Sequence, residues 1–166
     1  MSRVTLRRAT IDDGPSLIRA NAENRSYHLP WVEPFADRVG FDVWFDRSAS
    51  GRHLNLVVIE TERGEIVGVV NLNEIVAGSF QSAYLGYYGM QAFAGRGFMT
   101  EAVGLAVQLA FDELGLHRVE ANIQPGNTRS IALVKRLGFS LEGFSPRYLR
   151  VAGEWRDHER WAILAD

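Results

Sequence analysis

Cysteine is absent from the 166-residue sequence. Its absence excludes disulfide bonds, cysteine-based metal sites and any covalent intermediate on a cysteine thiol. Lysine is nearly absent too, since Lys135 is the single lysine beside many arginines, and we interpret this as a compositional bias without functional meaning. No apolar run reaches the roughly 18 residues that a membrane-spanning helix needs, so we expect no membrane span.

Neither sign of charge is in large excess. The formal net charge is −2 and the isoelectric point is about 6.1, which argues against a nucleic-acid partner. The histidines are not spaced as metal ligands, so we expect no metal site. The N-terminal Met-Ser-Arg leads into a strand-like stretch without the apolar region of a signal peptide, and we therefore expect a cytoplasmic protein.

Hydrophobic residues make up 46% of the sequence, enough for one well-packed core, and we expect a single domain over residues 1–166. The apolar patterns begin mostly with strands and continue as β-α-β-α-β-β, which indicates a mixed α/β domain around one sheet. We predict strands at 4–8, 53–61, 65–74, 82–89, 119–123, 139–144 and 154–164, and helices at 10–24, 37–49, 100–114 and 128–137.

The sequence Gly95-Arg96-Gly97 lies between a predicted strand and a predicted buried helix. Glycines let the backbone approach a ligand closely, and the unpaired N–H groups of a helix start attract anions. A tight strand-to-helix turn without a ligand is the alternative. A Walker loop is excluded because no lysine is present, and a Rossmann fingerprint because Thr100 stands where the third glycine is required.

Two further motifs accompany this loop. One is Asn127-Thr128-Arg129-Ser130, which is followed by a short helix pattern and by Leu137-Gly138-Phe139. The other is the C-terminal stretch 147–158, Arg-Tyr-Leu-Arg-Val-Ala-Gly-Glu-Trp-Arg-Asp-His. Together with the early His28-Leu29-Pro30-Trp31, the sequence resembles the GNAT acetyltransferase superfamily over residues 4–164, and within it the RimJ/RimL-type N-acetyltransferases.

The resemblance implies the GNAT fold, with a central, mostly antiparallel sheet of about seven strands flanked by helices, and it implies acetyl-CoA as the co-substrate. The family loop pattern Gln/Arg-x-x-Gly-x-Gly/Ala matches at Gly97 and departs at Ala94 and Met99. We therefore expect backbone N–H groups of the loop, and not its side chains, to bind the pyrophosphate. The residues implied to bind the cofactor are Gly89, Met90, Gln91, Gly95, Arg96, Gly97, Phe98, Met99, Thr100, Asn127 and Ser130. Asn127 is equally well explained as a helix N-cap.

Many relatives carry a tyrosine that protonates the leaving thiolate, but Val134 occupies that position here. RimL-like relatives carry a serine suited to this role, and it corresponds to Ser130. Without cysteine, we expect direct attack by a neutral amine on the thioester, with Glu74 as a candidate base or a solvated strand end. Glu120 is better explained by an ion pair and Glu101 by the dipole of the helix that it begins. A backbone N–H near Gly89 or Met90 is the candidate oxyanion donor.

The acceptor is less well defined than the cofactor. His28, Trp31 and Tyr148 are candidate acceptor-binding residues, although isolated surface or packing roles explain them as well. The subgroup favours a protein N-terminal α-amino group, such as that of a ribosomal protein, as the acceptor. A small-molecule amine such as a polyamine, aminoglycoside or amino acid remains an alternative, as does a catalytically weak acyl-CoA-binding module. Related folds often form homodimers, but the sequence does not show the oligomeric state.

Overall fold

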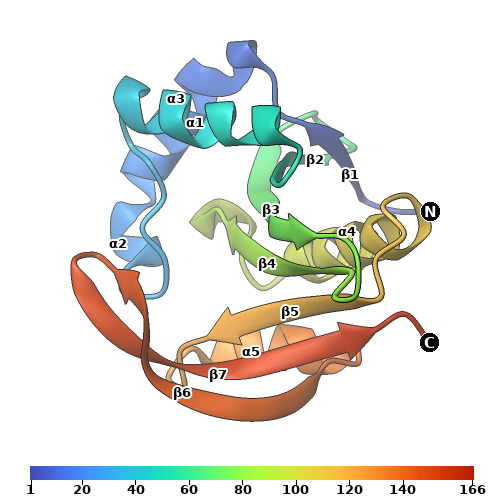
Figure 1. Ribbon diagram of the computed structural model, residues 1–166. Coiled ribbons are helices and arrows are strands. Elements are labelled where there is room, and N and C mark those ends of the chain that lie inside the picture. Colours follow the sequence, from blue (N-terminus) through green and yellow to red (C-terminus); the bar gives the residue numbers. More distant parts are fainter.

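The computed structural model describes residues 1–166 and contains one seven-stranded sheet in the order β1-β2-β3-β4-β5-β7-β6 (Figure 1). Only β4 and β5 are parallel, and every other neighbouring pair is antiparallel. The strands are β1 Val4–Arg8, β2 Leu54–Glu60, β3 Ile66–Val76, β4 Ser82–Gly89, β5 Arg118–Ile123, β6 Ser140–Val151 and β7 Glu154–Leu164. The predicted mixed α/β fold with a mostly antiparallel sheet is confirmed.

Helices cover both faces of this sheet. They are the α-helices α1 Gly14–Glu23, α2 Arg25–His28, α3 Arg38–Asp46, α4 Phe98–Asp112 and α5 Thr128–Arg136, and the short 3₁₀ helices η1 Ile11–Asp13, η2 Arg47–Ser50 and η3 Gln91–Phe93. No helix is both long enough and apolar enough to cross a bilayer.

Strand β2 is buried at nearly every position because it has a hydrophobic core on each side. Leu56 and Val58 belong to the larger core, which lies against α4 and α5. Val57 points the other way and packs with Leu17 of α1 and Phe41 of α3. Helix α4 is apolar around most of its circumference because it lies deep in the larger core.

Among the differences between the predicted and observed elements, three have a clear physical reason or affect the site. Helix α4 begins at Phe98 and not at residue 100, because the left-handed backbone of Gly97 reverses the chain there. A one-turn helix, Arg25–His28, lies where irregular structure was expected. Strand β6 continues to Val151 and not to 144; it is a largely exposed edge strand, so the apolar alternation that reveals a strand is missing.

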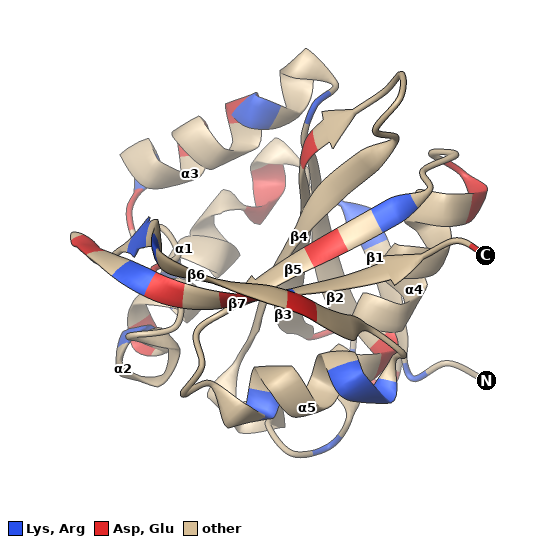
Figure 2. Cartoon of the chain, turned by 60° about the horizontal axis from the view of Figure 1, so that its bottom comes forward, with Lys and Arg blue, Asp and Glu red and all other residues tan.

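Charged side chains of both signs are interleaved over the surface strands. Figure 2 shows Lys and Arg alternating with Asp and Glu along β5 and β7. Arg118 of β5 contacts both Glu120 and Glu142, at 3.3 and 2.7 Å. This part of the surface therefore presents no continuous field of one sign.

Candidate functional site

The parallel strands β4 and β5 separate before either strand ends. Their last paired residues are Leu85 and Ala121. Strand β4 continues to Gly89 and β5 to Ile123 without pairing to each other, and Figure 1 shows the two strands diverging. Backbone N–H and C=O groups on the facing edges of this split can therefore pair with a ligand that lies extended between the strands.

Gly89 presents its backbone to the split. The N–H of Met90 donates to the carbonyl oxygen of Val67 at 2.9 Å, so it points toward β3 and is already used. Because backbone groups alternate in direction along a strand, the N–H of Gly89 points to the opposite side. Two backbone N–H groups were predicted as oxyanion donors. The N–H of Gly89 is available for this role, whereas the N–H of Met90 is already hydrogen-bonded to Val67.

Two opposed glycines allow helix α4 to approach the end of β4. Gly68 of β3 and Gly89 of β4 lie directly opposite each other. A Cβ on Gly68 would lie 2.5 Å from Met99 Sδ, and a Cβ on Gly89 would lie 2.9 Å from Met99 Cγ. The first turn of α4 therefore rests directly on the sheet, next to the split.

The N-terminus of α4 presents free backbone amides. Gly97 is the residue that precedes the helix, and its φ of +80° is left-handed; Gly95 has a φ of +75°. No side chain caps the helix, so the N–H groups of its first turn, from Phe98 to Thr100, have no side-chain partner. These amides and the helix dipole form a site suited to a phosphate anion.

Arg96 adds a positive charge to this turn. Its guanidinium carbon lies 4.7 Å from the centre of the Phe98 ring, and no carboxylate pairs with it. The carboxylate of Glu101 does not neutralise this charge, because it already accepts hydrogen bonds from the backbone N–H and the guanidinium of Arg3. The backbone and side-chain hydrogen bonds from Arg3 lower the pKa of Glu101. Glu101 is thus occupied in a structural contact.

Asn127 begins helix α5. Its side-chain oxygen accepts a hydrogen bond from the N–H of Ser130 at 3.4 Å, as predicted for an N-cap. Whether it also contacts a pantetheine chain stays a prediction.

The hydroxyl of Ser130 is hydrogen-bonded to the hydroxyl of Tyr87 on β4. Burial raises the pKa of Tyr87 to about 12, so its phenol stays protonated near neutral pH. Val134, one turn further along α5, is buried in the core and supplies no hydroxyl. Sequence reasoning missed Tyr87; its position two residues after Leu85 on the core-facing side of β4 was the available signal.

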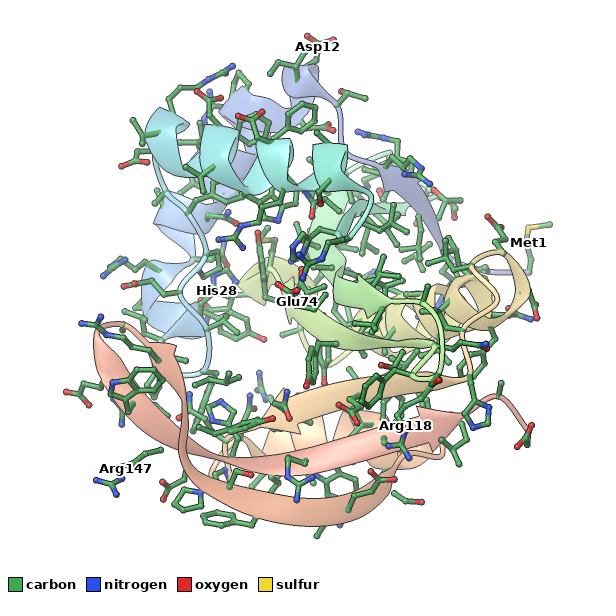
Figure 3. All side chains as sticks on the ribbon, in the orientation of Figure 1. Met1, Asp12, His28, Glu74, Arg118 and Arg147 are labelled. Carbon is green, nitrogen blue, oxygen red and sulfur yellow. The ribbon has the colours of Figure 1, made fainter.

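The predicted acceptor residues lie in two places. His28 is buried, with 3% of its surface exposed, and its Nε2 lies 2.8 Å from the carbonyl oxygen of Gly89 (Figure 3). The ring of Trp31 lies over Gly126 in the β5–α5 loop, 3.2 Å from where a Cβ would be. Both residues thus border the split, and a direct contact with the acceptor stays a prediction.

Tyr148 lies on β6 beside a cluster on the sheet face opposite the larger core. Tyr84 of β4 and Glu120 of β5 are directly paired there. Burial raises the pKa of Tyr84, and the neighbouring Tyr148 and Glu120 raise it further. Arg160 of β7 lies on the same face and donates to Ser145 at 3.1 Å. Tyr84 and Arg160 are therefore additional candidates for contact with an acceptor, which sequence reasoning did not select.

Glu74 does not lie where its predicted role as a base requires. It lies beside the turn that joins β3 to β4, whereas Gly89 is at the far end of β4. Its carboxylate is ion-paired with Arg52 and lies 3.6 Å from His53 Nε2. At about 3.3 Å per residue, six residues of β3 separate it by about 20 Å from Gly68, the partner of Gly89. The structure therefore gives Glu74 a surface ion pair in place of a catalytic position.

A mostly antiparallel sheet whose two parallel strands split beside an uncapped helix start defines an acyl-CoA-type N-acyltransferase. Residues 3–140 match the family described as the acetyltransferase (GNAT) domain. The chain belongs to the GNAT acetyltransferase family, as the sequence motifs predicted, and is an acyltransferase.

Individual relatives refine this assignment. The ribosomal protein uS5-alanine N-acetyltransferase of Escherichia coli strain K12 is 37% identical over 153 residues, which are 86% of this chain and 77% of the relative. The solved structure of Mycobacterium smegmatis RimJ in complex with CoA-disulfide has a TM-score of 0.88 and 31% identity, covering 98% of this chain and 82% of that one. The spermidine N(1)-acetyltransferase of Escherichia coli strain K12 is 26% identical over 85% of this chain and 75% of its own length.

Proposed function

We propose that this protein transfers an acetyl group from acetyl-CoA to a protein N-terminal α-amino group by direct attack. The observation that carries the proposal is the split between β4 and β5, which leads from the free amides of α4 to the paired hydroxyls of Tyr87 and Ser130. The 37% identity to a ribosomal protein uS5-alanine N-acetyltransferase supports the choice of acceptor. A ribosomal-protein acceptor also supports action in the cytoplasm.

The residues of the split suit an extended CoA. Amides from Gly95 to Thr100 would hold the pyrophosphate, with Arg96 beside it. The edge of β4 near Gly89 would pair with the pantetheine arm, and Asn127 would contact it from α5. The bound co-substrate supplies an activated acetyl group as a thioester.

The chain itself then has two tasks in the transfer. The N–H of Gly89 stabilises the negative charge that develops on the thioester oxygen when the amine attacks. The hydroxyl of Ser130 delivers a proton to the departing sulfur, while the amine gives up one proton to water, and that proton returns to the Ser130 oxygen through water. An α-amino group has a pKa of about 8, which leaves a usable neutral fraction at pH 7 without a strong base. Positioning accounts for much of the remaining rate enhancement.

A polyamine acceptor is the second candidate, because the chain is 26% identical to a spermidine N(1)-acetyltransferase. A polyamine carries several positive charges and is best held by several carboxylates. The face that carries Tyr148 offers Glu120, but Arg118 is paired with it and Arg160 lies nearby. This mixture of charges favours the peptide acceptor over the polyamine.

Acceptor specificity tests the proposal directly. The purified protein is mixed with acetyl-CoA and with peptides that begin in alanine or serine, with the same peptides already N-acetylated, or with spermidine. CoA release is followed with a thiol reagent, which does not react with this cysteine-free chain, and the products are identified by mass spectrometry. The proposal requires a higher kcat/KM for the free peptides than for spermidine. CoA binding without release on any acceptor would instead indicate a binding module.

A further inference from the structure

The segment His28–Trp31 crosses the open end of the split between β4 and β5. On the β4 side, His28 Nε2 lies 2.8 Å from the carbonyl oxygen of Gly89. A carbonyl only accepts, so Nε2 carries the hydrogen and donates it. The His28 ring also packs edge-on against Tyr88, with 4.9 Å between the ring centres. His28 thus fixes the last residue of β4.

The same segment fixes the end of β5. Gln124 directly follows β5, is buried, and donates from Nε2 to the carbonyl oxygen of Pro30 at 2.7 Å. The ring of Trp31 covers Gly126, where a Cβ would lie only 3.2 Å from the ring. The two strand ends are therefore joined by the four-residue segment His28–Trp31, which we call the bridge.

The helices before this segment are anchored to the end of β4 as well. Asn21 Nδ2 donates to the hydroxyl of Tyr88 at 3.1 Å. Asn24 Oδ1 accepts a hydrogen bond from the N–H of Gln91 at 2.8 Å. The segment from Tyr88 to Gln91 is thus hydrogen-bonded to three side chains, those of Asn21, Asn24 and His28. These bonds hold the N-terminal end of the bridge in place against β4.

Beyond Leu85 and Ala121 no ladder bond holds β4 and β5 at a set distance. The distance between the strand ends then depends on the contacts that span the gap, and the bridge supplies two of them, in addition to the hydrogen bond between Tyr87 and Ser130. The bond from His28 uses the carbonyl of Gly89 and leaves the N–H of the same residue free on the same edge. A small movement of this carbonyl would therefore move the N–H as well.

We propose that His28 and Gln124 are positioning residues that clamp the split and hold the Gly89 N–H where it polarises the thioester carbonyl. This inference rests on the proposed function. It assigns neither residue to contact with the reacting atoms; both act through Gly89. A misplacement of about 1 Å in such a site can lower turnover about a hundredfold.

Four variants and one control test the clamp. His28→Phe keeps an aromatic ring and removes the donor, whereas His28→Gln keeps an N–H at a similar reach. Gln124→Met removes the donor on the β5 side, and the double variant His28→Phe/Gln124→Met tests coupling. The control is Trp44→Phe, which removes a hydrogen bond of 3.0 Å from Trp44 Nε1 to Asn71 Oδ1, between α3 and β3, and removes no bond made by His28 or Gln124.

The measurements are kcat with the preferred acceptor and the dissociation constant of CoA by calorimetry. We expect His28→Phe and Gln124→Met to lower kcat at least about tenfold and to weaken CoA less than about threefold. His28→Gln should restore kcat to within about threefold of wild type, and the double variant should lose less than the product of the two single losses. Trp44→Phe should leave kcat within about twofold, since it removes a stabilising hydrogen bond but none that is made to Gly89 or to the bridge.

Full turnover in His28→Phe, or equal losses in His28→Phe and Trp44→Phe, would overturn the clamp and leave the proposed function intact. Independent losses that multiply in the double variant would overturn it too, because the two residues would then not act on one gap. Absence of transfer by the wild-type protein to every acceptor would instead refute the proposed function, and this inference with it.

Discussion

The hydroxyl groups of Tyr87 on β4 and Ser130 on α5 are hydrogen-bonded to each other, although 43 residues separate them in the sequence. Ser130 therefore has a fixed orientation at the wall of the split. The resemblance implied a tyrosine at the position of the buried Val134, so on α5 the hydroxyl that lies against β4 is that of Ser130.

Ser130→Ala should lower kcat at least about tenfold, because general acids commonly contribute about 10²–10⁴ in rate and a CoA thiolate is already a fair leaving group. Tyr87→Phe should lower kcat less than Ser130→Ala does, since it removes only the hydroxyl group that orients Ser130. Burial raises the pKa of Tyr87 to about 12, so the pH profile of kcat between 6 and 9.5 should keep its shape in Tyr87→Phe. Unchanged turnover of Ser130→Ala across this pH range would remove Ser130 from the mechanism.

Gly95→Ala should weaken CoA binding at least about fivefold, because a left-handed φ of +75° strains any residue with a Cβ by about 1–2 kcal/mol and the turn would relax away from the α4 amides. Gly115→Ala is the matched control. Gly115 has a φ of +67° near the other end of α4, and a Cβ at either glycine meets no atom within 4 Å. Both variants should lose similar thermal stability, while calorimetry should show weaker CoA binding for Gly95→Ala alone.

Glu74→Gln should leave the ratio of variant to wild-type kcat constant across pH. The carboxylate is about half exposed, is paired with Arg52, and lies at the closed end of the β3–β4 hairpin. A general base would show the opposite, namely a larger loss at low pH, where less free amine is present. Such a loss would return Glu74 to the mechanism and would place the acceptor nearer this hairpin.

Stability should fall as the pH drops from 7 toward 5. Burial lowers the pKa of His28 and of His158 below the ordinary 6.5, so the unfolded chain takes up protons before the folded chain does. Each histidine then removes up to about 1.4 kcal/mol of unfolding free energy per pH unit between its folded and unfolded pKa. Urea unfolding at pH 7 and 5.5 should show a smaller difference for His28→Gln than for wild type. His117→Gln, at an exposed position, is the matched control for replacing a histidine.

Much of the local structure followed from the sequence. Two β-rich runs separated by Glu62-Arg63-Gly64 predicted β2 and β3, the apolar circumference of α4 predicted a buried helix, and Asn127 was predicted as the N-cap of α5. These features depend on backbone preferences and side-chain periodicity within a few residues. The glycines around Arg96 likewise indicated an anion site beside α4 before the fold was known, and the motifs identified the GNAT family.

Contacts between distant segments were decided only by the tertiary structure. Tyr87 meets Ser130, His28 meets Gly89 across 61 residues, and Glu74 is drawn to Arg52 away from the split. No local pattern encodes which of two hydroxyls will face each other or how far two strand ends diverge. Those relations arise when helices pack on both faces of the sheet, because close packing of separate elements, and not backbone preference, fixes the distances between them.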